Sequence, residues 1–225
     1  MKPHAIRPTP LVPATTSSEA VYPSLVAQGI ACGRGGRPLL TDLNLSLQPG
    51  EILWVKGGNG RGKSSLLRIL ASVVPPDEGR VDWASRPVYL GHANALKEDL
   101  SAFESLAFMA GLHGLAVTSD AVEQALKRFG MYARRRAMVR TFSQGQRRRV
   151  ALARLLLNPL PGPWVLDEPF DALDKAGIEV LNEVIENHVR QGGSVVMTSH
   201  VDLSFKSCVH REFLLPDPTQ TVKQL

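Results

Sequence analysis

The sequence has few cysteines and no long apolar run. Its 225 residues include only two cysteines, Cys32 and Cys208, with no CxxC pair and no histidine at metal-ligand spacing from them. This scarcity argues against a disulfide framework and predicts reduced thiols in a cytoplasmic setting. No stretch reaches the roughly 20 apolar residues that a membrane-spanning helix needs. The basic residues 1–8 are not followed by the apolar segment of a secretory signal. A membrane role would therefore need another chain as anchor.

Overall composition leaves several functions open. The chain is 44% hydrophobic and 21% charged, which is ordinary for a globular protein large enough to bury a core. Its net charge of +5 is compatible with nucleic acid, an anionic membrane surface or phosphate ligands. Only the motifs can distinguish these three possibilities.

The proline content divides the chain. Residues 1–24 hold five prolines and a Thr/Ser run, which predicts a disordered tail, because too few apolar residues are present to offset the entropy of ordering. We expect the folded domain to span residues 25–215, with a second tail at residues 216–225. Within the domain, helical periodicity without a strand signal predicts a short inserted helical subdomain at about residues 97–155.

Short apolar runs alternate with helix-length segments. This alternation predicts an α/β fold with a mostly parallel sheet, to which we add an antiparallel β subdomain near the N-terminus. Continuous apolar runs indicate strands buried on both faces. The predicted strands are residues 52–55, 88–90, 164–166 and 195–197, and the clearest helices are residues 63–72 and 144–157.

A glycine-rich segment satisfies the pattern GxxxxGK[ST] directly after one predicted strand and directly before a helix. This context predicts a P-loop, in which glycines let backbone N–H groups surround phosphate oxygens. Lys63 would contact the β- and γ-phosphates, and the Ser64 hydroxyl would bind Mg²⁺. The predicted ATP-binding residues here are Gly57, Gly58, Asn59, Gly60, Arg61, Gly62, Lys63, Ser64 and Ser65.

Two carboxylates follow another predicted strand about a hundred residues later. Asp167 and Glu168 end the apolar run 164–166, which places them at the carboxyl edge of the sheet, where α/β folds bind ligands. We predict that Asp167 positions Mg²⁺ and that Glu168 is the general base for the attacking water.

Residues 141–154 resemble the signature motif of ABC ATPases, with Phe142 and Gln144 departing from the usual LSGGQ. Ser143 is expected to cap the following helix, so that N–H groups of residues 143–146 form a second anion site. The resemblance covers about residues 25–215 and implies a homodimer in which each signature faces the partner's P-loop. It also implies ATP and Mg²⁺ as ligands. Further residues that it assigns to the site are Gly145, Gln146, Asp174 of the segment 171–174, and His200.

The sequence most resembles the CcmA family of cytochrome c maturation ATPases. His92 stands where most ABC ATPases have a glutamine, and no aromatic residue lies near position 34, so Arg34 or Arg37 is left to stack on adenine. The resemblance implies ATP-driven heme export or release of the heme chaperone CcmE. It also implies a CcmB-like membrane subunit with CcmC and CcmD, at the cytoplasmic face of a bacterial inner membrane.

The sequence gives no heme ligand and only candidate contacts with the membrane subunit. We assign no heme ligand, because His92, His113 and His188 are better explained as motif or surface residues. Candidate contacts with the membrane subunit are Leu96, Phe103, Phe108 and Met109, for which core packing is the competing role.

Three alternative functions remain. The first is the ATPase of another small-solute or lipid transporter. The second is a soluble ABC protein that acts on ribosomes or DNA, suggested only by the arginine runs 134–136 and 147–149. The third is a regulatory binder that does not hydrolyse ATP, which the presence of Lys63, Asp167 and Glu168 opposes.

Overall fold

The computed structural model describes residues 23–158, 160–203 and 205–216. The predicted N-terminal tail, apart from Pro23 and Ser24, and the predicted C-terminal tail from residue 217 lie outside the described residues. The first described segment is held by backbone hydrogen bonds at Ser24. Ser24 is buried, its N–H donates to the carbonyl of Leu47, and its own carbonyl accepts from Ala84. The described part of the chain contains no helix long and apolar enough to cross a bilayer.

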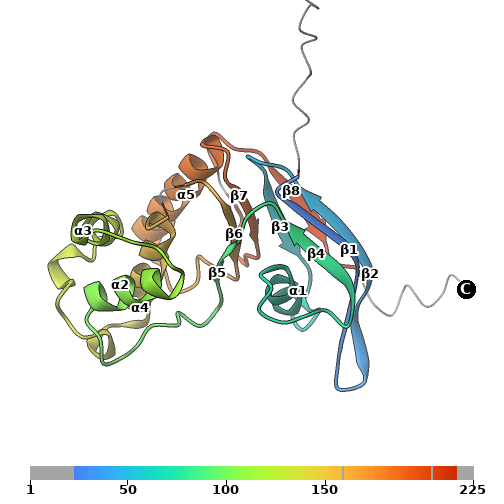
Figure 1. Ribbon diagram of the computed structural model, residues 1–225, viewed down its shortest axis with the longest axis horizontal. Coiled ribbons are helices and arrows are strands. Elements are labelled where there is room, and N and C mark those ends of the chain that lie inside the picture. The colour runs from blue at the N-terminus through green and yellow to red at the C-terminus, as the bar shows by residue number, and fades with distance from the viewer. Residues whose placement is uncertain (1–22, 159, 204, 217–225) are drawn as a thin grey trace, which may run out of the picture.

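A five-stranded parallel sheet forms the centre of the molecule (Figure 1). It confirms the predicted α/β class, and all four predicted strands are present. The fifth strand, β8, was not predicted, since its polar ends give no apolar run. In the order β5-β6-β7-β3-β8, the strands are Val88–Leu90, Pro163–Leu166, Ser194–Met197, Ile52–Lys56 and His210–Leu214.

The prediction that all four strands are buried on both faces is wrong for β5. It lies at the edge of the sheet, where Val88 and Tyr89 are only half-buried. An edge strand pairs on one side only, so burial there depends on the layer that covers it.

The predicted antiparallel subdomain is a three-stranded sheet of order β2-β1-β4, next to helix α1. Its strands are β1 (Leu25–Arg34), β2 (Arg37–Leu47) and β4 (Glu78–Trp83). The β1–β2 turn is made by Gly35 and Gly36, both with positive φ, a conformation that glycine adopts without strain. Helix α1 (Lys63–Leu70) ends two residues earlier than predicted, and Ser72 after it has a φ of 56°.

The helical layer lies on the other side of the parallel sheet from α1 (Figure 1). It contains α2 (Ala102–Leu112), α3 (Ser119–Arg128) and α4 (Gln144–Ala153), while α5 (Lys175–Arg190) packs along the sheet. The expected helix 144–157 is not continuous, because it becomes a 3₁₀ turn at Arg154–Leu156. Two further 3₁₀ turns are Tyr132–Arg134 and Val139–Thr141.

The parallel sheet separates two apolar cores. Trp164 and Leu166 of β6 face the core that includes the helical layer and α5, whereas Val165 between them faces the core under α1 and the antiparallel sheet. This alternation follows from the two-residue period of a strand. Each central strand therefore packs side chains into both cores, and packing on both faces of the sheet fixes the position of its end.

The expectation that His188 lies on the surface is wrong. The residue is 7% exposed, its ring stacks on Trp164 with 3.5 Å between ring centroids, and Nε2 is 2.7 Å from the carbonyl oxygen of Gly162. Burial lowers the pKa of His188 to about 4, against the opposing effect of the Gly162 hydrogen bond. The ring is therefore neutral near pH 7 and ties α5 to the loop before β6.

Candidate functional site

A cavity of about 430 Å³ lies at the carboxyl edge of the parallel sheet. We call it the carboxyl-edge cavity. It brings together most of the predicted P-loop residues, both predicted carboxylates and both predicted histidines. From these sets it is lined by Asn59, Gly60, Gly62, Lys63, Ser64, Ser65, His92, Asp167, Glu168 and His200, and it also includes Arg34, Leu39 and Asp171.

The P-loop connects β3 to the N-terminus of α1, and its backbone requires glycine. Gly57, Gly60 and Gly62 have φ values of 152°, 76° and 93°, which residues with a Cβ rarely adopt. The Lys63 ammonium donates to the carbonyls of Gly57 at 2.7 Å and Gly58 at 3.3 Å. The lysine is thus held over the loop, beside the helix N-terminus, where a phosphate would meet both its charge and free backbone N–H groups.

Asp167 lies directly after β6 and is 2% exposed. Its Oδ1 accepts hydrogen bonds from the Ser64 hydroxyl at 3.2 Å and from the Thr198 hydroxyl at 3.0 Å. The described residues contain no cluster of three or more His, Cys, Asp or Glu side chains that could bind a metal alone. The oxygen pair from Ser64 and Asp167 fits Mg²⁺, which prefers oxygen ligands and usually keeps water and substrate phosphates as the others.

Glu168 has an unusual backbone and a restrained side chain. Its φ of 48° ends the strand, and its N–H donates to the Thr198 hydroxyl at 2.9 Å. Its Oε2 accepts from the His200 N–H at 2.9 Å, and its Oε1 lies 3.4 Å from His200 Nε2. Burial raises the pKa of Glu168, although His200 acts in the opposite direction. A carboxylate with a raised pKa at a cavity wall is suited to accept a proton from water.

Arg148 is a supporting residue of this site that sequence reasoning missed. Its guanidinium is 2% exposed and donates to the carbonyls of Asp167, Glu168 and Pro169 on one side. On the other side it donates at 3.1 Å to both the Gly91 carbonyl and the Asn94 Oδ1. It therefore joins the segment after β5 to the segment after β6. The run of three arginines signalled a basic helix, but nothing in it showed which arginine points inward.

Two further predicted positions have new neighbours. Nδ1 of the exposed His92 lies 3.4 Å from an Asp171 carboxylate oxygen, a partner that the sequence did not suggest. Of the two arginines considered for adenine stacking, Arg34 lines the cavity and Arg37 does not. The geometry therefore favours Arg34.

Comparison with known proteins places this chain in a family. The family described as ABC transporter matches residues 40–171, which include the P-loop, the segment 141–154 and both carboxylates. This chain is an ABC transporter ATPase. As a member of that family it is an ATP-hydrolysing enzyme of the ABC type.

Relatives named "Cytochrome c biogenesis ATP-binding export protein CcmA" match this ABC ATPase over most of its length. The protein from Albidiferax ferrireducens is 43% identical over 190 residues, which cover 79% of this chain and 90% of the relative. The one from Methylococcus capsulatus is 44% identical over 188 residues, with coverage of 78% and 90%. The resemblance to the CcmA family is confirmed at this level.

Solved structures support the fold of this ABC ATPase. A putative ABC transporter ATP-binding protein from Pyrococcus furiosus superposes with a TM-score of 0.72 at 24% identity, covering 85% of this chain and 96% of that one. An ATP-binding subunit of an ABC transporter gives a TM-score of 0.71 at 23% identity, with 79% of each chain covered.

The signature segment of this ABC ATPase does not line its own carboxyl-edge cavity. Ser143 caps α4 as predicted, but the expectation of four free N–H groups at residues 143–146 is wrong for two of them. The N–H of Gln146 donates to the Ser143 hydroxyl, and the N–H of Ser143 donates to the Gln146 side chain. Gly145 is needed for a different reason, because a Cβ there would lie 2.8 Å from the Ala172 carbonyl oxygen.

Asp174 also lies outside the carboxyl-edge cavity. It caps α5 by accepting from the Gly177 N–H at 2.9 Å, and it forms an ion pair with Arg149. Within the described chain, these contacts give Asp174 a capping role. Any contact with nucleotide would have to be made across a dimer.

Proposed function

We propose that this chain is the ATP-hydrolysing subunit of an exporter for cytochrome c biogenesis, serving heme export or release of a heme-loaded chaperone. The observation that carries this proposal is the extended identity to CcmA relatives, which spans the P-loop, the carboxylate pair and the signature segment. His92 stands where most ABC ATPases have a glutamine, a replacement that resembles the CcmA family. It lines the cavity where the γ-phosphate would lie.

In the proposed reaction, the protein supplies positions and charges for phosphoryl transfer to water. Lys63 leaves the P-loop carbonyls and contacts the β- and γ-phosphates of ATP. Ser64 and Asp167 would hold Mg²⁺, which would supply positive charge to the phosphates when bound. Glu168 accepts the proton of the attacking water, and His200 orients the Glu168 carboxylate from the following strand. His92, which lines the cavity, would donate a hydrogen bond to the water or the phosphate.

The proposed active unit is a homodimer. Ser143, Gly145 and Gln146 lie outside the cavity of their own chain, so they can contact phosphate only when a second copy presents them. The free backbone N–H groups at the start of α4 and the Ser143 hydroxyl would then complete the phosphate shell. This arrangement makes hydrolysis depend on closure of two chains.

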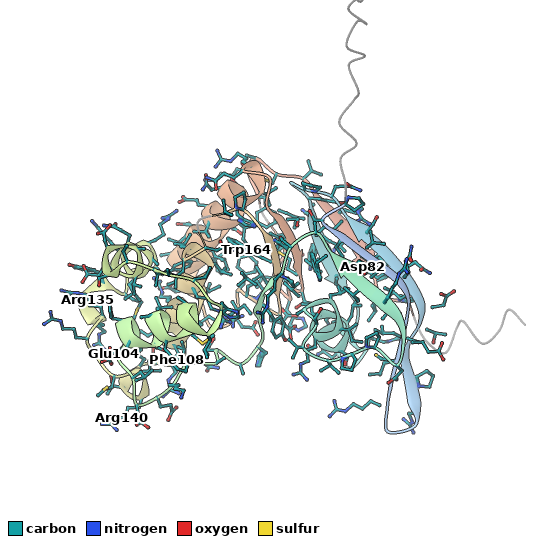
Figure 2. The ribbon with its side chains drawn as sticks, in the orientation of Figure 1. Asp82, Glu104, Phe108, Arg135, Arg140 and Trp164 are labelled. Atoms are coloured by element: carbon teal, nitrogen blue, oxygen red, sulfur yellow. The ribbon has the colours of Figure 1, made fainter. Side chains whose placement is uncertain are left out.

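We also infer that the dimer binds peripherally to a CcmB-like membrane subunit, together with CcmC and CcmD, at the cytoplasmic face of the inner membrane. Among the candidate contacts, Phe108 on α2 is 38% exposed, and the Lys97 ammonium lies 4.6 Å from its ring centroid; Figure 2 labels it in the helical layer. Leu96 and Phe103 pack against the helical core, which supports the competing packing role for these two.

The test is heme staining of membrane c-type cytochromes in a strain that lacks this gene. Complementation with the wild type should restore the stained bands, and Glu168→Gln should not. The matched control is Glu183→Gln, which changes an exposed glutamate on α5 far from the cavity and should restore the bands. Normal bands in the deletion strain, with no second copy of the gene, would exclude cytochrome c biogenesis and favour another small-solute or lipid exporter.

A further inference from the structure

A second cavity, of about 380 Å³, lies at the opposite end of strands β5 and β6. We call it the amino-edge pocket. Its wall is formed by the segment before β5 (residues 85–87), the C-terminal end of α2, and residues 154, 157, 158 and 160–162 before β6. The carboxyl-edge cavity begins beyond the other ends of these strands, so the two sites share the strands but no lining residue.

Arg154 is the most unusual group in the wall of the amino-edge pocket. It is 7% exposed, and its Nε has no hydrogen-bond partner within the described residues. Burial lowers the pKa of Arg154 to about 10, so the guanidinium is still charged at neutral pH. The nearby charged residue Arg148 adds to this destabilisation, and Tyr89 opposes it weakly. A buried N–H of a charged group that lacks an acceptor is costly, and this unsatisfied Nε makes Arg154 a candidate site for an anion.

The other ionisable groups at the pocket are basic. Arg86 lies on the rim, and His113 has its pKa lowered by burial and by the positive charges of Arg86 and Arg154. Among the described residues, no aspartate or glutamate lines the wall. An entering anion would therefore meet two arginines and a histidine that can donate a hydrogen bond, with no competing carboxylate in place.

The rest of the wall is apolar. Met109, Ala110 and Leu157 line the interior, and Leu160 lies at the mouth with 73% of its surface exposed. Apolar walls with a few convergent polar groups, in a volume of this size, are typical of sites for small organic ligands. The ligand must therefore combine an apolar body with a negatively charged head.

We propose that the amino-edge pocket binds a small amphiphilic anion, with its head group on the Arg154 guanidinium and its apolar body against Met109 and Leu157. The ligand class is a medium-chain carboxylate or a molecule of similar size with one anionic group. The site is distinct from the ATP site, and its occupant neutralises a charge for which the described residues supply no counter-ion.

The test compares two fluorescent probes with the same apolar framework. 1-Anilinonaphthalene-8-sulfonate carries a negative charge, and N-phenyl-1-naphthylamine does not. Titrations are made on the full chain saturated with Mg-ADP, so that the nucleotide site is filled. We expect the charged probe to bind the wild type and to be displaced by decanoate but not by decanol. Arg154→Met should weaken binding of the charged probe about tenfold or more, and leave binding of the neutral probe unchanged.

A second variant guards against misfolding of Arg154→Met. Ser85→Glu places a carboxylate at the exposed rim of the amino-edge pocket, where it can pair with the arginines and should block decanoate. Arg128→Met, at an exposed arginine of α3, is the matched control and should bind like the wild type. Equal affinity for the two probes, or displacement by decanoate that persists in folded Ser85→Glu, would overturn the proposal.

Discussion

Two arginines six positions apart lie at opposite ends of the same strands. Arg148 at the carboxyl edge and Arg154 at the amino edge are both almost fully buried, at 2% and 7% exposure. Arg148 donates to four carbonyls and to an asparagine side chain, whereas the Nε of Arg154 has no partner among the described residues. Burial alone therefore does not define what a charge does. At the carboxyl edge, the buried charge of Arg148 holds the backbone of the segments that carry the ATP site. At the amino edge, the buried charge of Arg154 is available to an external anion.

The largest effect is expected at the carboxyl edge, from removal of the proposed general base. Glu168→Gln should lower kcat for ATP hydrolysis by about 10² to 10⁴-fold, because the amide cannot accept the proton from water. ATP binding should persist, and the variant should accumulate as an ATP-bound dimer in size-exclusion chromatography. Glu183→Gln is the control and should keep wild-type turnover. A Glu168→Gln protein that stays monomeric with ATP and hydrolyses it at the wild-type rate would disprove the assigned role.

Arg148→Met tests the partnered arginine through stability. Its loss leaves several buried carbonyls without a donor, so we expect the free energy of unfolding to fall by about 3 kcal/mol or more. Urea unfolding followed by circular dichroism measures the change, with an unaltered m-value showing that the same structure unfolds. Arg147→Met removes a half-exposed ion pair with Glu98 and hydrogen bonds to the carbonyls of Arg140 and Phe142, and it should cost less than Arg148→Met, about 1 kcal/mol. Equal losses in the two variants would contradict a bracing role for Arg148.

His188 should make the amino edge sensitive to acid. Its pKa is about 4 in the folded chain, against 6.5 for an ordinary histidine. Between these values the unfolded chain binds a proton and the folded chain does not, so stability rises with pH. About 3 kcal/mol is therefore lost as the pH falls from 6.5 to 4. Unfolding of the wild type and of His188→Leu across this range isolates the effect, since the variant should lack this part of the slope. Identical slopes would show that His188 is protonated in the fold.

The smallest effect is expected for Arg154→Met, and its sign is the opposite of that for Arg148→Met. The change removes a buried charge that has no counter-ion within the described chain, while methionine fills a similar volume. We expect the free energy of unfolding to stay constant or to rise by up to about 1 kcal/mol. A loss as large as that of Arg148→Met would show that Arg154 has structural partners, and the contrast between the two edges would disappear.

Local sequence patterns predicted the parts of the site that depend on neighbours in the chain. The P-loop needs glycines at fixed spacing beside a helix start, and Asp167 and Glu168 follow a strand directly, so the sequence alone could name residues that the structure brings to one cavity. Three of the four predicted strands were also buried as expected. The strand β8 was not found, because its sequence HREFL is largely polar and its pairing with β3 is decided by residues 158 positions away.

The missed features depend on contacts between distant segments. Arg148 reaches residues 91, 94 and 167–169, and no local pattern separates it from the arginines beside it. His188 looked like a surface histidine until Trp164 and Gly162 were placed against it. The capping box at Ser143 could have been found, since glutamine three residues after serine is its known pattern. The Asp171 partner of His92 had no such signal.

The alternation of β6 between two cores also determines on which side of the sheet the residues after it lie. Trp164 and Leu166 belong to one core and Val165 to the other, so Asp167 continues toward the side of α1, where the Ser64 hydroxyl meets it. Adding or removing one residue in this strand would exchange the two cores and turn Asp167 away from Ser64. The length of β6 can therefore change only in steps of two. The same register of β6 fixes which side chains enter each core and where Asp167 lies, so a shift of one position would disrupt both.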